Sequence, residues 1–312
     1  MLLITGGTGF VGGYVLEALE DKVPRNQVRI LARGGDDLVK LGKQGYDTVA
    51  GSVTNKEEIA HAMRGVDTVL HLVAIIREDK SRGQTFDRVI GEGTENVVGA
   101  AKAAGVKRFI FMSALGAPNA STPYFRNKIR GEQAVKASGI PYTIFRPSFL
   151  IGPGGEFTAL LKQLTMLPVV PVLGPGNYPV QPVYVRDMAR NFAQAIDDER
   201  YMDQTFEFGG PETFEYNDML RQTLDARGKK GFLFHAPLPL VKPVVPVIDR
   251  VLPKLITKDQ FTMLLEGSST SDTRLREIGG FDLTPFRQAI EIALKMPPPA
   301  TYAKAKARPA AA

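Results

Sequence analysis

The sequence has 312 residues, 44% of them hydrophobic, which is enough for one large core or for two unequal lobes. It contains no cysteine and only three scattered histidines, His61, His71 and His235, which excludes disulfides and thiolate chemistry and argues against a histidine metal cluster. Because the net charge of +6 is spread along the chain, we interpret it as a solvated surface rather than a site for nucleic acid or anionic lipid.

The hydropathy pattern indicates the cellular compartment in which we expect the protein. No apolar run approaches the roughly 18 to 20 residues that a membrane-spanning helix needs. Since the first predicted strand begins at residue 2, we expect no targeting segment and a cytoplasmic protein. Residues 236–261 are apolar but broken by five prolines, and we interpret them as part of a second lobe. The alternative is a surface that docks on a partner or peripherally on the inner face of a membrane.

Short apolar runs alternate with helical patterns through the first half of the chain. The strands are predicted at 2–5, 28–32, 48–50, 68–73, 108–112 and 143–146, and the helices between them at 10–19, 56–63, 84–104 and 124–137. The strand runs are almost continuously apolar, as in parallel strands that are buried on both faces. This alternation predicts an α/β fold with a doubly wound parallel sheet.

Three glycines lie in the turn after the first strand and in the first turn of the helix that follows. Gly6, Gly9 and Gly12 form a GxxGxxG pattern in "LLITGGTGFVGGYVLEAL". Gly6 would permit the tight turn, Gly9 would let backbone amides approach a pyrophosphate, and Gly12 would let the helix pack closely against the sheet. Between a strand and a helix of a βαβ chain, this pattern predicts a dinucleotide-binding turn.

The end of the second strand bears on which dinucleotide binds. It reads "ILARGGDD", with Arg33 where a carboxylate would otherwise bind the ribose 2′-hydroxyl. A guanidinium suits a 2′-phosphate, so we favour NADP(H) over NAD(H). Asp36 and Asp37 follow two glycines, either as solvated loop residues or within reach of the ribose.

A tyrosine and a lysine follow the fifth strand at helical spacing. Thr122 and Pro123 form a helix start, so Tyr124 falls in the first turn and Lys128 one turn later on the same face. A neighbouring ammonium group and the helix N-terminus would favour a phenolate, which suits proton transfer near neutral pH. Ser113, at the end of the strand, would hold the substrate oxygen. The alternative is that Tyr124 packs in the core and Lys128 is solvated.

Past residue 151 prolines and glycines become frequent, as in "IGPGGEF" and "LPVVPVLGPGNYPVQP", which predicts loops that face a substrate. We expect residues 1–152 to form the dinucleotide-binding domain, with 179–208 returning to it. Residues 153–178 and 209–298 would form a smaller, discontinuous C-terminal lobe, and 299–312 a disordered Pro/Ala tail.

Several stretches resemble the short-chain dehydrogenase/reductase superfamily in its extended and atypical branches. "TGGTGFVG" is similar to the extended cofactor fingerprint, "GTENVVGAAKAAGVKRFIFMSA" to the fourth helix and fifth strand, and "RPSFLIGPG" to the stretch that passes the nicotinamide. "VDTVLHLVAIIRE", "MSALGA" and "QPVYVRDMA" resemble the atypical group related to the NADPH-binding accessory subunit of respiratory complex I. The likeness implies a Rossmann fold and is strongest over residues 1–155.

The resemblance implies roles for individual residues. Ser113, Tyr124 and Lys128 would be the catalytic triad, with Lys128 also holding the nicotinamide ribose, and no residue would bind a metal. The implied cofactor contacts are Gly6, Thr8, Gly9, Phe10, Val11, Gly12, Arg33, Ser52, Val53, Leu72, Val73, Ala74, Met112, Lys128, Pro147 and Phe149.

The sequence departs from the family pattern in three places. Ser52 replaces the family's Asp after the third strand, which fits a more negatively charged cofactor. Ile90 stands where many extended members carry a proton-relay asparagine. Ser113 and Tyr124 are close in sequence, which makes a large sugar nucleotide an unexpected substrate. We expect His71, on the fourth strand, to be a core residue rather than a base.

Three functions are compatible with this pattern of residues. The first is an NADP(H)-dependent enzyme that transfers a hydride on a carbonyl or hydroxyl of a small molecule, as a reductase, epimerase or dehydratase. The second is a non-catalytic, NADPH-loaded accessory or assembly factor of a respiratory NADH:quinone oxidoreductase or of quinone biosynthesis. The third, a redox-sensing regulator, is disfavoured because such sensors often lack the Tyr/Lys pair.

Overall fold

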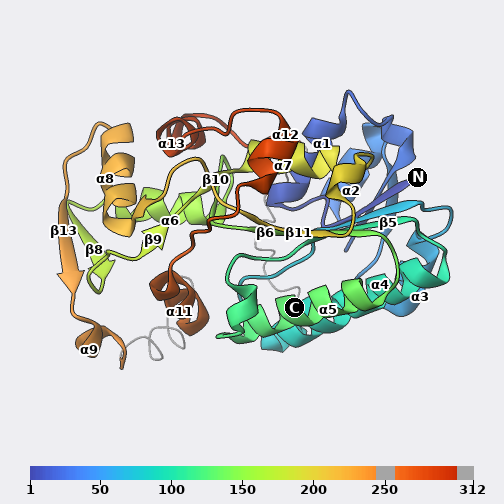
Figure 1. The fold of residues 1–312 in the computed structure, drawn as a ribbon, viewed down its shortest axis with the longest axis horizontal. Coiled ribbons are helices and arrows are strands. Elements are labelled where there is room, and N and C mark those ends of the chain that lie inside the picture. The colour runs from blue at the N-terminus through green and yellow to red at the C-terminus, as the bar shows by residue number, and fades with distance from the viewer. Residues whose placement is uncertain (244–256, 301–312) are drawn as a thin grey trace.

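The computed structural model describes residues 1–243 and 257–300 of the chain (Figure 1). Its centre is a seven-stranded parallel sheet in the order β11-β6-β5-β4-β1-β2-β3. The strands are β1 (Leu2–Thr5), β2 (Val28–Ala32), β3 (Asp47–Ala50), β4 (Thr68–His71), β5 (Arg108–Met112), β6 (Tyr142–Pro147) and β11 (Gln204–Phe208). The order reverses between β1 and β4, and in such sheets ligands bind outside the carboxyl ends of the strands at the reversal.

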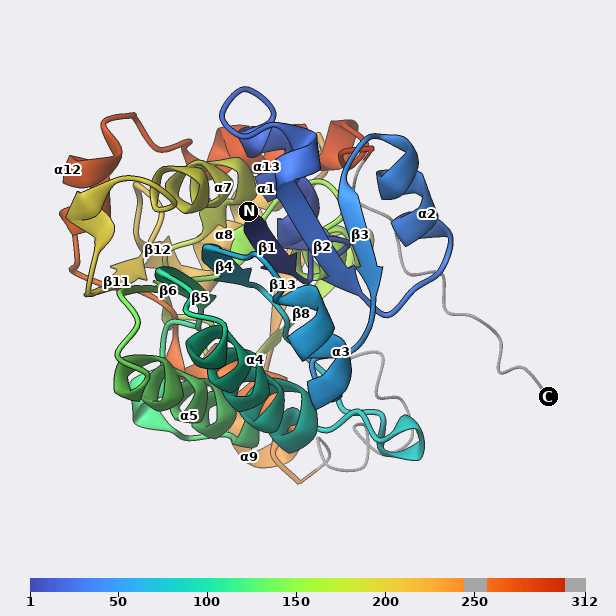
Figure 2. The ribbon, with the colours of Figure 1, turned by 90° about the vertical axis from the view of Figure 1, so that its right-hand side faces the viewer.

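Helices cover both faces of this sheet (Figure 2). One face carries α3 (Lys56–Ala62), α4 (Gly93–Ala103) and α5 (Pro123–Ala137). The other carries α1 (Phe10–Leu19) and α7 (Val185–Gln194), which pack against each other, and α2 (Asp36–Lys43) lies beside β3. The fold class predicted from the sequence, a doubly wound Rossmann sheet, is confirmed.

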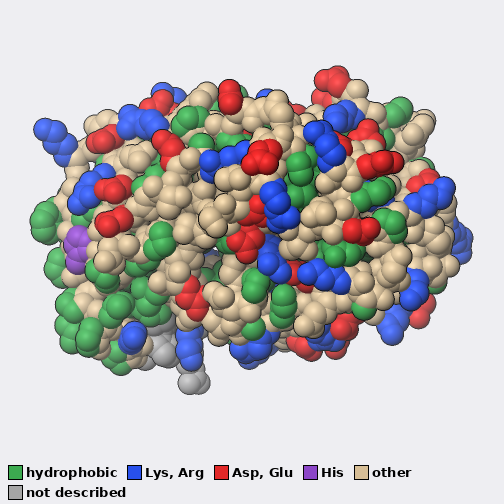
Figure 3. Space-filling model, in the orientation of Figure 1, with side chains coloured by type: hydrophobic (Ala, Val, Ile, Leu, Met, Phe, Trp, Pro, Cys, Tyr) green, Lys and Arg blue, Asp and Glu red, His purple; other side chains and the backbone are tan. Residues whose placement is uncertain are grey.

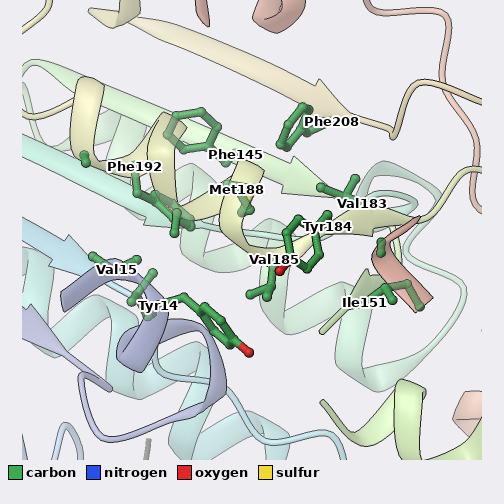
Figure 4. Close-up of a cluster of buried hydrophobic side chains, with 14 of the residues drawn as sticks. Tyr14, Val15, Phe145, Ile151, Val183, Tyr184, Val185, Met188, Phe192 and Phe208 are labelled. Atoms are coloured by element: carbon green, nitrogen blue, oxygen red, sulfur yellow. The ribbon is translucent and has the colours of Figure 1, made fainter. Parts of the chain in front are cut away.

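The core explains why the strand sequences are continuously apolar. In β1, Leu2 and Ile4 belong to the apolar cluster on the α1 and α7 face, whereas Leu3 belongs to the cluster beneath α4 and α5. A strand covered on both faces buries every successive side chain. On the α7 face, Phe145 of β6 meets the ring of Phe192 edge-on with centroids 4.9 Å apart (Figure 4).

Most of the remaining elements lie beyond the carboxyl ends of the strands (Figure 1). The helices there are α6 (Glu156–Leu164), α8 (Tyr216–Ala226), α9 (Leu238–Val241) and α11 (Lys258–Glu266), with α12 (Arg274–Gly279) and α13 (Phe286–Lys295) packing back toward α7, α6 and α8. Three strand pairs join them: β7 (Leu150–Ile151) with β10 (Val183–Tyr184), β9 (Pro179–Val180) with β12 (Phe214–Glu215), and β8 (Val169–Leu173) with β13 (Phe232–Ala236). Short 3-10 turns lie at Arg25–Gln27, Lys80–Arg82, Ala117–Asn119 and Glu199–Tyr201.

Two local predictions were wrong. The stretch at 167–182, predicted as a loop, contains β8, and the exposed Pro171 is tolerated in β8 because that strand pairs on one side only. The single helix predicted at 84–104 begins at residue 87 as a π-helix, Asp87–Glu92, before α4. Of the two alternatives for Asp36 and Asp37, the loop does not hold: both lie in the first turn of α2, where carboxylates are favourable at the helix N-terminus.

The predicted domain division stays a prediction, although β11 does place residues 204–208 in the central sheet. The predicted disordered tail falls mainly on 301–312, and half of the proline-rich segment on 244–256. Both stretches lie outside the described residues. Within the described residues, we find no helix that combines the length and the apolar character needed to span a membrane.

Candidate active site

The glycine turn joins β1 to α1 in four residues. Gly6 has φ +80°, a conformation that favours glycine, and its carbonyl accepts the Gly9 N–H at 3.0 Å. Gly9 caps α1 in an extended conformation without a side-chain cap. A Cβ on Gly12 would lie 2.4 Å from Gly6 O and 2.6 Å from Gly7 Cα. Gly12 therefore packs the helix against the turn itself, not against the sheet as we expected.

This turn satisfies what a dinucleotide diphosphate needs. A side chain in place of Gly6, Gly9 or Gly12 would occupy the space beside the turn. The ten-residue helix α1 starts without a side-chain cap, so its first turn offers amide donors and positive partial charge. Across the turn, a Cβ on Gly6 would lie 3.2 Å from Leu72 C and Val73 N, so the loop after β4 forms its neighbouring wall. The residues present fit the group that the sequence predicts.

The end of β2, where the sequence predicts the adenosine of the cofactor, is open around Arg33. This residue follows β2 directly, is exposed, and pairs with no other side chain within the described part of the chain. Gly34 and Gly35, both with positive φ, separate it from α2. Ser52 donates its backbone N–H to Glu58 Oε2 at 2.7 Å. The Glu58 carboxylate of α3 therefore lies at the position after β3, where this sequence has Ser52 in place of the family's Asp. No pattern in the sequence indicated this role of Glu58.

Lys128 is buried, with 1% of its surface exposed. Its Nζ donates to the carbonyl of Met112 at 2.7 Å and lies 5.9 Å from the centroid of the Tyr124 ring. Burial lowers the pKa of Lys128 to about 7, although the Glu132 carboxylate raises it. The alternative of a solvated lysine is therefore wrong.

Tyr124 differs from the expectation in one respect. Burial raises the pKa of Tyr124 to about 12, whereas the sequence predicted a lowered pKa. The physical cause is desolvation of the phenol on burial, and the Lys128 ammonium, which donates to the Met112 carbonyl, does not offset it. The ring of Tyr124 meets Phe86 edge-on at 5.8 Å.

Ser113 is held by a buried ion pair that the sequence analysis missed. Its Oγ donates to Glu132 Oε1 at 2.6 Å. Arg146 donates to both oxygens of the same carboxylate, at 2.9 and 2.6 Å, and this hydrogen bonding raises the pKa of Arg146. The signal was present, because Glu132 lies one helical turn after Lys128 and Arg146 lies on the strand beside Ser113.

Several of the predicted site residues line one cavity of about 450 Å³. Met112, Ser113, Tyr124, Pro147 and Phe149 all line it. Its other walls are largely apolar and come from the loop after β4, from α6 and from α11, with Ile76, Phe157, Leu160, Met263 and Leu264 among them. Arg77 also lines it, and the Arg77 Nε is buried without a hydrogen-bond partner within the described residues. Gly6 to Gly12 and Arg33 are not among its lining residues.

Three further positions that the sequence analysis names lie in the core. His71 is fully buried, with its ring nitrogens 2.6 Å from Thr5 Oγ1 and 3.0 Å from Thr94 Oγ1. Burial lowers the pKa of His71 to about 3, so the ring is neutral and has no path to substrate as a base. Ile90 is buried in the π-helix, and Val53 is buried against Gly93.

Comparison with known proteins agrees with this geometry. The sequence profile of a family described as NAD(P)H-binding matches residues 6–164. The chain belongs to this NAD(P)H-binding family. It is similar, at 27% identity over 91% of this chain and 74% of the relative, to subunit 9 of the NADH dehydrogenase [ubiquinone] 1 alpha subcomplex, mitochondrial, of Arabidopsis thaliana.

A second relative is named as a reductase. It is the (4-alkanoyl-5-oxo-2,5-dihydrofuran-3-yl)methyl phosphate reductase of Streptomyces griseus, at 30% identity over 73% of this chain and 74% of that protein. Among solved structures, the NADPH-dependent quinone oxidoreductase of Escherichia coli in complex with NADPH superposes with a TM-score of 0.78 and 20% identity, over 95% of this chain and all of that one. The likeness to the solved structure shows the fold, and the relatives bear out the resemblance to reductases and to the complex I subunit.

Proposed function

We propose that the protein is an NADP(H)-dependent oxidoreductase that acts on a carbonyl or hydroxyl group of an apolar small molecule. The observation that carries this proposal is that Ser113 and Tyr124 line one largely apolar cavity beside the buried Lys128. A cavity with apolar walls and a few convergent polar groups is the usual form of a small-molecule site. When bound, the nicotinamide would supply or accept the hydride.

In this proposal, Gly6, Gly9 and Gly12 hold the diphosphate at the start of α1, and Lys128 holds the nicotinamide ribose. Tyr124 transfers the proton at its phenolic oxygen to or from the substrate oxygen. Ser113 presents its lone pairs to the cavity, because its own proton is donated to Glu132. The apolar walls exclude water from the reacting atoms.

The preference for NADP(H) rests on Arg33. Its guanidinium is exposed at the end of β2 with no competing partner in the described residues, and a 2′-phosphate would supply one. The negative charge of Glu58 opposes this preference, because it would repel a 2′-phosphate. Its carboxylate, however, already accepts the Ser52 N–H.

The test is a turnover assay with purified protein, NADPH and a panel of apolar aldehydes, ketones and quinones. We expect NADPH oxidation with at least one member, and a loss of about 100-fold or more in kcat for Tyr124→Phe with unchanged NADPH affinity. The matched control is Tyr142→Phe, a half-buried tyrosine on β6 that does not line the cavity. Turnover that survives in Tyr124→Phe would contradict the proposed role.

One observation favours the second function, a non-catalytic accessory factor. The Arabidopsis relative, which matches 91% of this chain, is named as a subunit of NADH dehydrogenase. In that case NADPH would co-purify with the protein, no substrate of the panel would be reduced, and Tyr124→Phe would retain the bound NADPH. The turnover assay distinguishes the two functions, because NADPH binding by Tyr124→Phe is expected in both.

A further inference from the structure

Exposed apolar side chains gather at the end of the molecule that is formed by β8, β13 and α9. Six of the ten large hydrophobic side chains that are exposed in the described residues lie on β8, on β13, in the turn before β8 or on α9. They are Met166, Leu167, Val169, Phe232, Phe234 and Leu240. Figure 3 shows hydrophobic side chains gathered at its lower left, over this end of the molecule. We call these six residues the ribbon face.

The strand register explains why the apolar side chains share a side. β8 and β13 form a two-stranded parallel ribbon in which Phe232 pairs with Val169 and Phe234 pairs with Pro171. Alternate residues of a strand point to one face, and all four of these are exposed. The intervening Val170 is fully buried on the opposite face. The two phenylalanines remain 69% and 51% exposed, which is unusual for a surface that faces only water.

The two chain segments that carry the ribbon face have charges of one sign. Residues 157–176 and 226–243 contain no Asp or Glu and five basic residues: Lys162, Arg227, Lys229, Lys230 and Lys242. Lys229 and Lys230 precede Phe232 and are exposed, and Lys242 follows Leu240 and is also exposed. The nearest carboxylates along the chain, Glu156 and Asp225, stand just outside these segments.

We propose that the ribbon face docks the protein on an anionic membrane surface. Exposed Phe and Leu side chains would enter the boundary between headgroups and acyl chains, and the flanking lysines would meet the negative surface potential. The same charge disfavours a second copy of this chain as the occupant, since two ribbon faces brought together would oppose lysines to lysines. This assignment replaces the solvated interpretation of the basic charge for these two segments.

The ribbon face also adjoins the cavity. Phe157, Leu160 and Gln163 of α6 line the cavity, and α6 ends two residues before Met166. Docking would bring the α6 wall of the cavity to the lipid surface, where apolar substrates concentrate. This last step rests on the proposed function, whereas the docking itself does not.

Co-sedimentation of the full chain with vesicles tests the proposal without any substrate. The vesicles are pure phosphatidylcholine, or phosphatidylcholine with a quarter of phosphatidylglycerol, at 0.1 M and 0.5 M NaCl. We expect binding to the anionic vesicles, much weaker binding to the neutral ones, and release by salt because screening weakens the lysine contacts. Equal binding to both vesicle types, or none to the anionic ones, would overturn the proposal.

Two double variants separate the apolar and the charged parts. Lys229→Gln with Lys230→Gln should weaken binding to anionic vesicles about 30-fold, from about fivefold for each lysine near an anionic surface. Phe232→Ser with Phe234→Ser should weaken it at least about tenfold. Matched controls are Lys136→Gln on α5 and Val39→Ser on α2, which are exposed elsewhere and should bind like the wild type.

The fold of each variant is checked by its thermal midpoint, and its oligomeric state by sedimentation velocity. If the Phe232/Phe234 variant binds vesicles like the wild type, or if the wild type is a dimer that this variant converts to monomer while vesicle binding is absent, the face has another occupant and the proposal fails. Failure of vesicle binding leaves the turnover assay unaffected, so the two proposals fail separately.

Discussion

The hydroxyl of Ser113 donates a 2.6 Å hydrogen bond to the buried carboxylate of Glu132. Arg146 donates to both oxygens of that carboxylate, so both oxygens act as acceptors and the serine proton points to Glu132. Ser113 can therefore accept a hydrogen bond from Tyr124 or from a substrate hydroxyl, but it has no proton left to donate to a substrate carbonyl. Glu132 is thus a positioning residue in the proposed reaction.

The first prediction is that Glu132→Gln reverses this hydrogen bond. The introduced side-chain amide would donate to Ser113 Oγ and free the serine proton for a substrate carbonyl, so we expect the ratio of kcat for reduction to kcat for alcohol oxidation to rise. Arg146 would keep the Glu207 carboxylate at 3.6 Å but lose its bidentate partner, at a cost of about 1–3 kcal/mol in the free energy of unfolding. The measurements are the two kcat values and urea unfolding. A merely structural role would lower both kcat values alike and leave their ratio unchanged.

The second prediction concerns Lys128 and pH. The pKa of Lys128 is about 7 in the folded protein against 10.5 for an ordinary lysine, so between pH 7 and about 10 the unfolded state binds more protons than the folded state. The free energy of unfolding should therefore rise with pH over this window, toward a gain of about 4–5 kcal/mol when the whole shift is recovered.

Lys128→Met should remove this pH dependence and stabilise the protein at pH 7, because it buries a thioether of similar length in place of an ammonium. It should also abolish turnover. Urea unfolding at pH 7, 8 and 9 of both proteins provides the measurement. A rise that persists unchanged in the variant would assign the proton release to another group.

Much of the fold could be predicted from the sequence, because both the strands and the helices follow hydrophobic periods. β1 is apolar at each position from Leu2 to Ile4, and α1 repeats Val11, Val15 and Leu19, so local pattern and tertiary burial agree there. The predictions failed where tertiary context decides. β8 contains Pro171 and lies between Pro168 and Gly174, and the π-helix at Asp87–Glu92 runs directly into α4 with nothing in the sequence to separate them.

The sequence predicted which residues form the candidate site, but not the hydrogen bonds that those residues make. The spacing of Tyr124 and Lys128 indicates one helix face, and this was enough to place them near Ser113. That the Lys128 ammonium binds the Met112 carbonyl, and that Glu132 takes the Ser113 proton, depends on how α5 packs on β5 and β6. The spacing within α5 carries no information about that packing.

The third prediction concerns the glycine turn. Gly12→Ala would place a methyl group 2.4 Å from the Gly6 carbonyl and 2.6 Å from Gly7 Cα, so the backbone of the turn must move. We expect a loss of about 1–3 kcal/mol in the free energy of unfolding, as for other overpacked sites, and a loss of NADPH binding. The control is Gly99→Ala on the exposed side of α4, where an added Cβ meets nothing within 4 Å. That variant should gain about 0.5–1 kcal/mol and bind NADPH normally. Unimpaired binding in Gly12→Ala would contradict the role of the turn.

The fourth prediction tests which coenzyme the adenosine end selects. Arg33→Ala removes the exposed guanidinium at the end of β2 without disturbing a side-chain contact, because Arg33 pairs with no other side chain in the described residues. If Arg33 binds the 2′-phosphate, the variant should lose about 1.5–3 kcal/mol of NADPH affinity, or about 10- to 150-fold in Kd, and should bind NADH as the wild type does. Calorimetric titration with each coenzyme measures both values, and Arg64→Ala, at a residue that is also exposed, is the matched control. An equal loss for NADH and NADPH would mean that Arg33 serves the shared part of the coenzyme, and the preference for NADP(H) would lose its support.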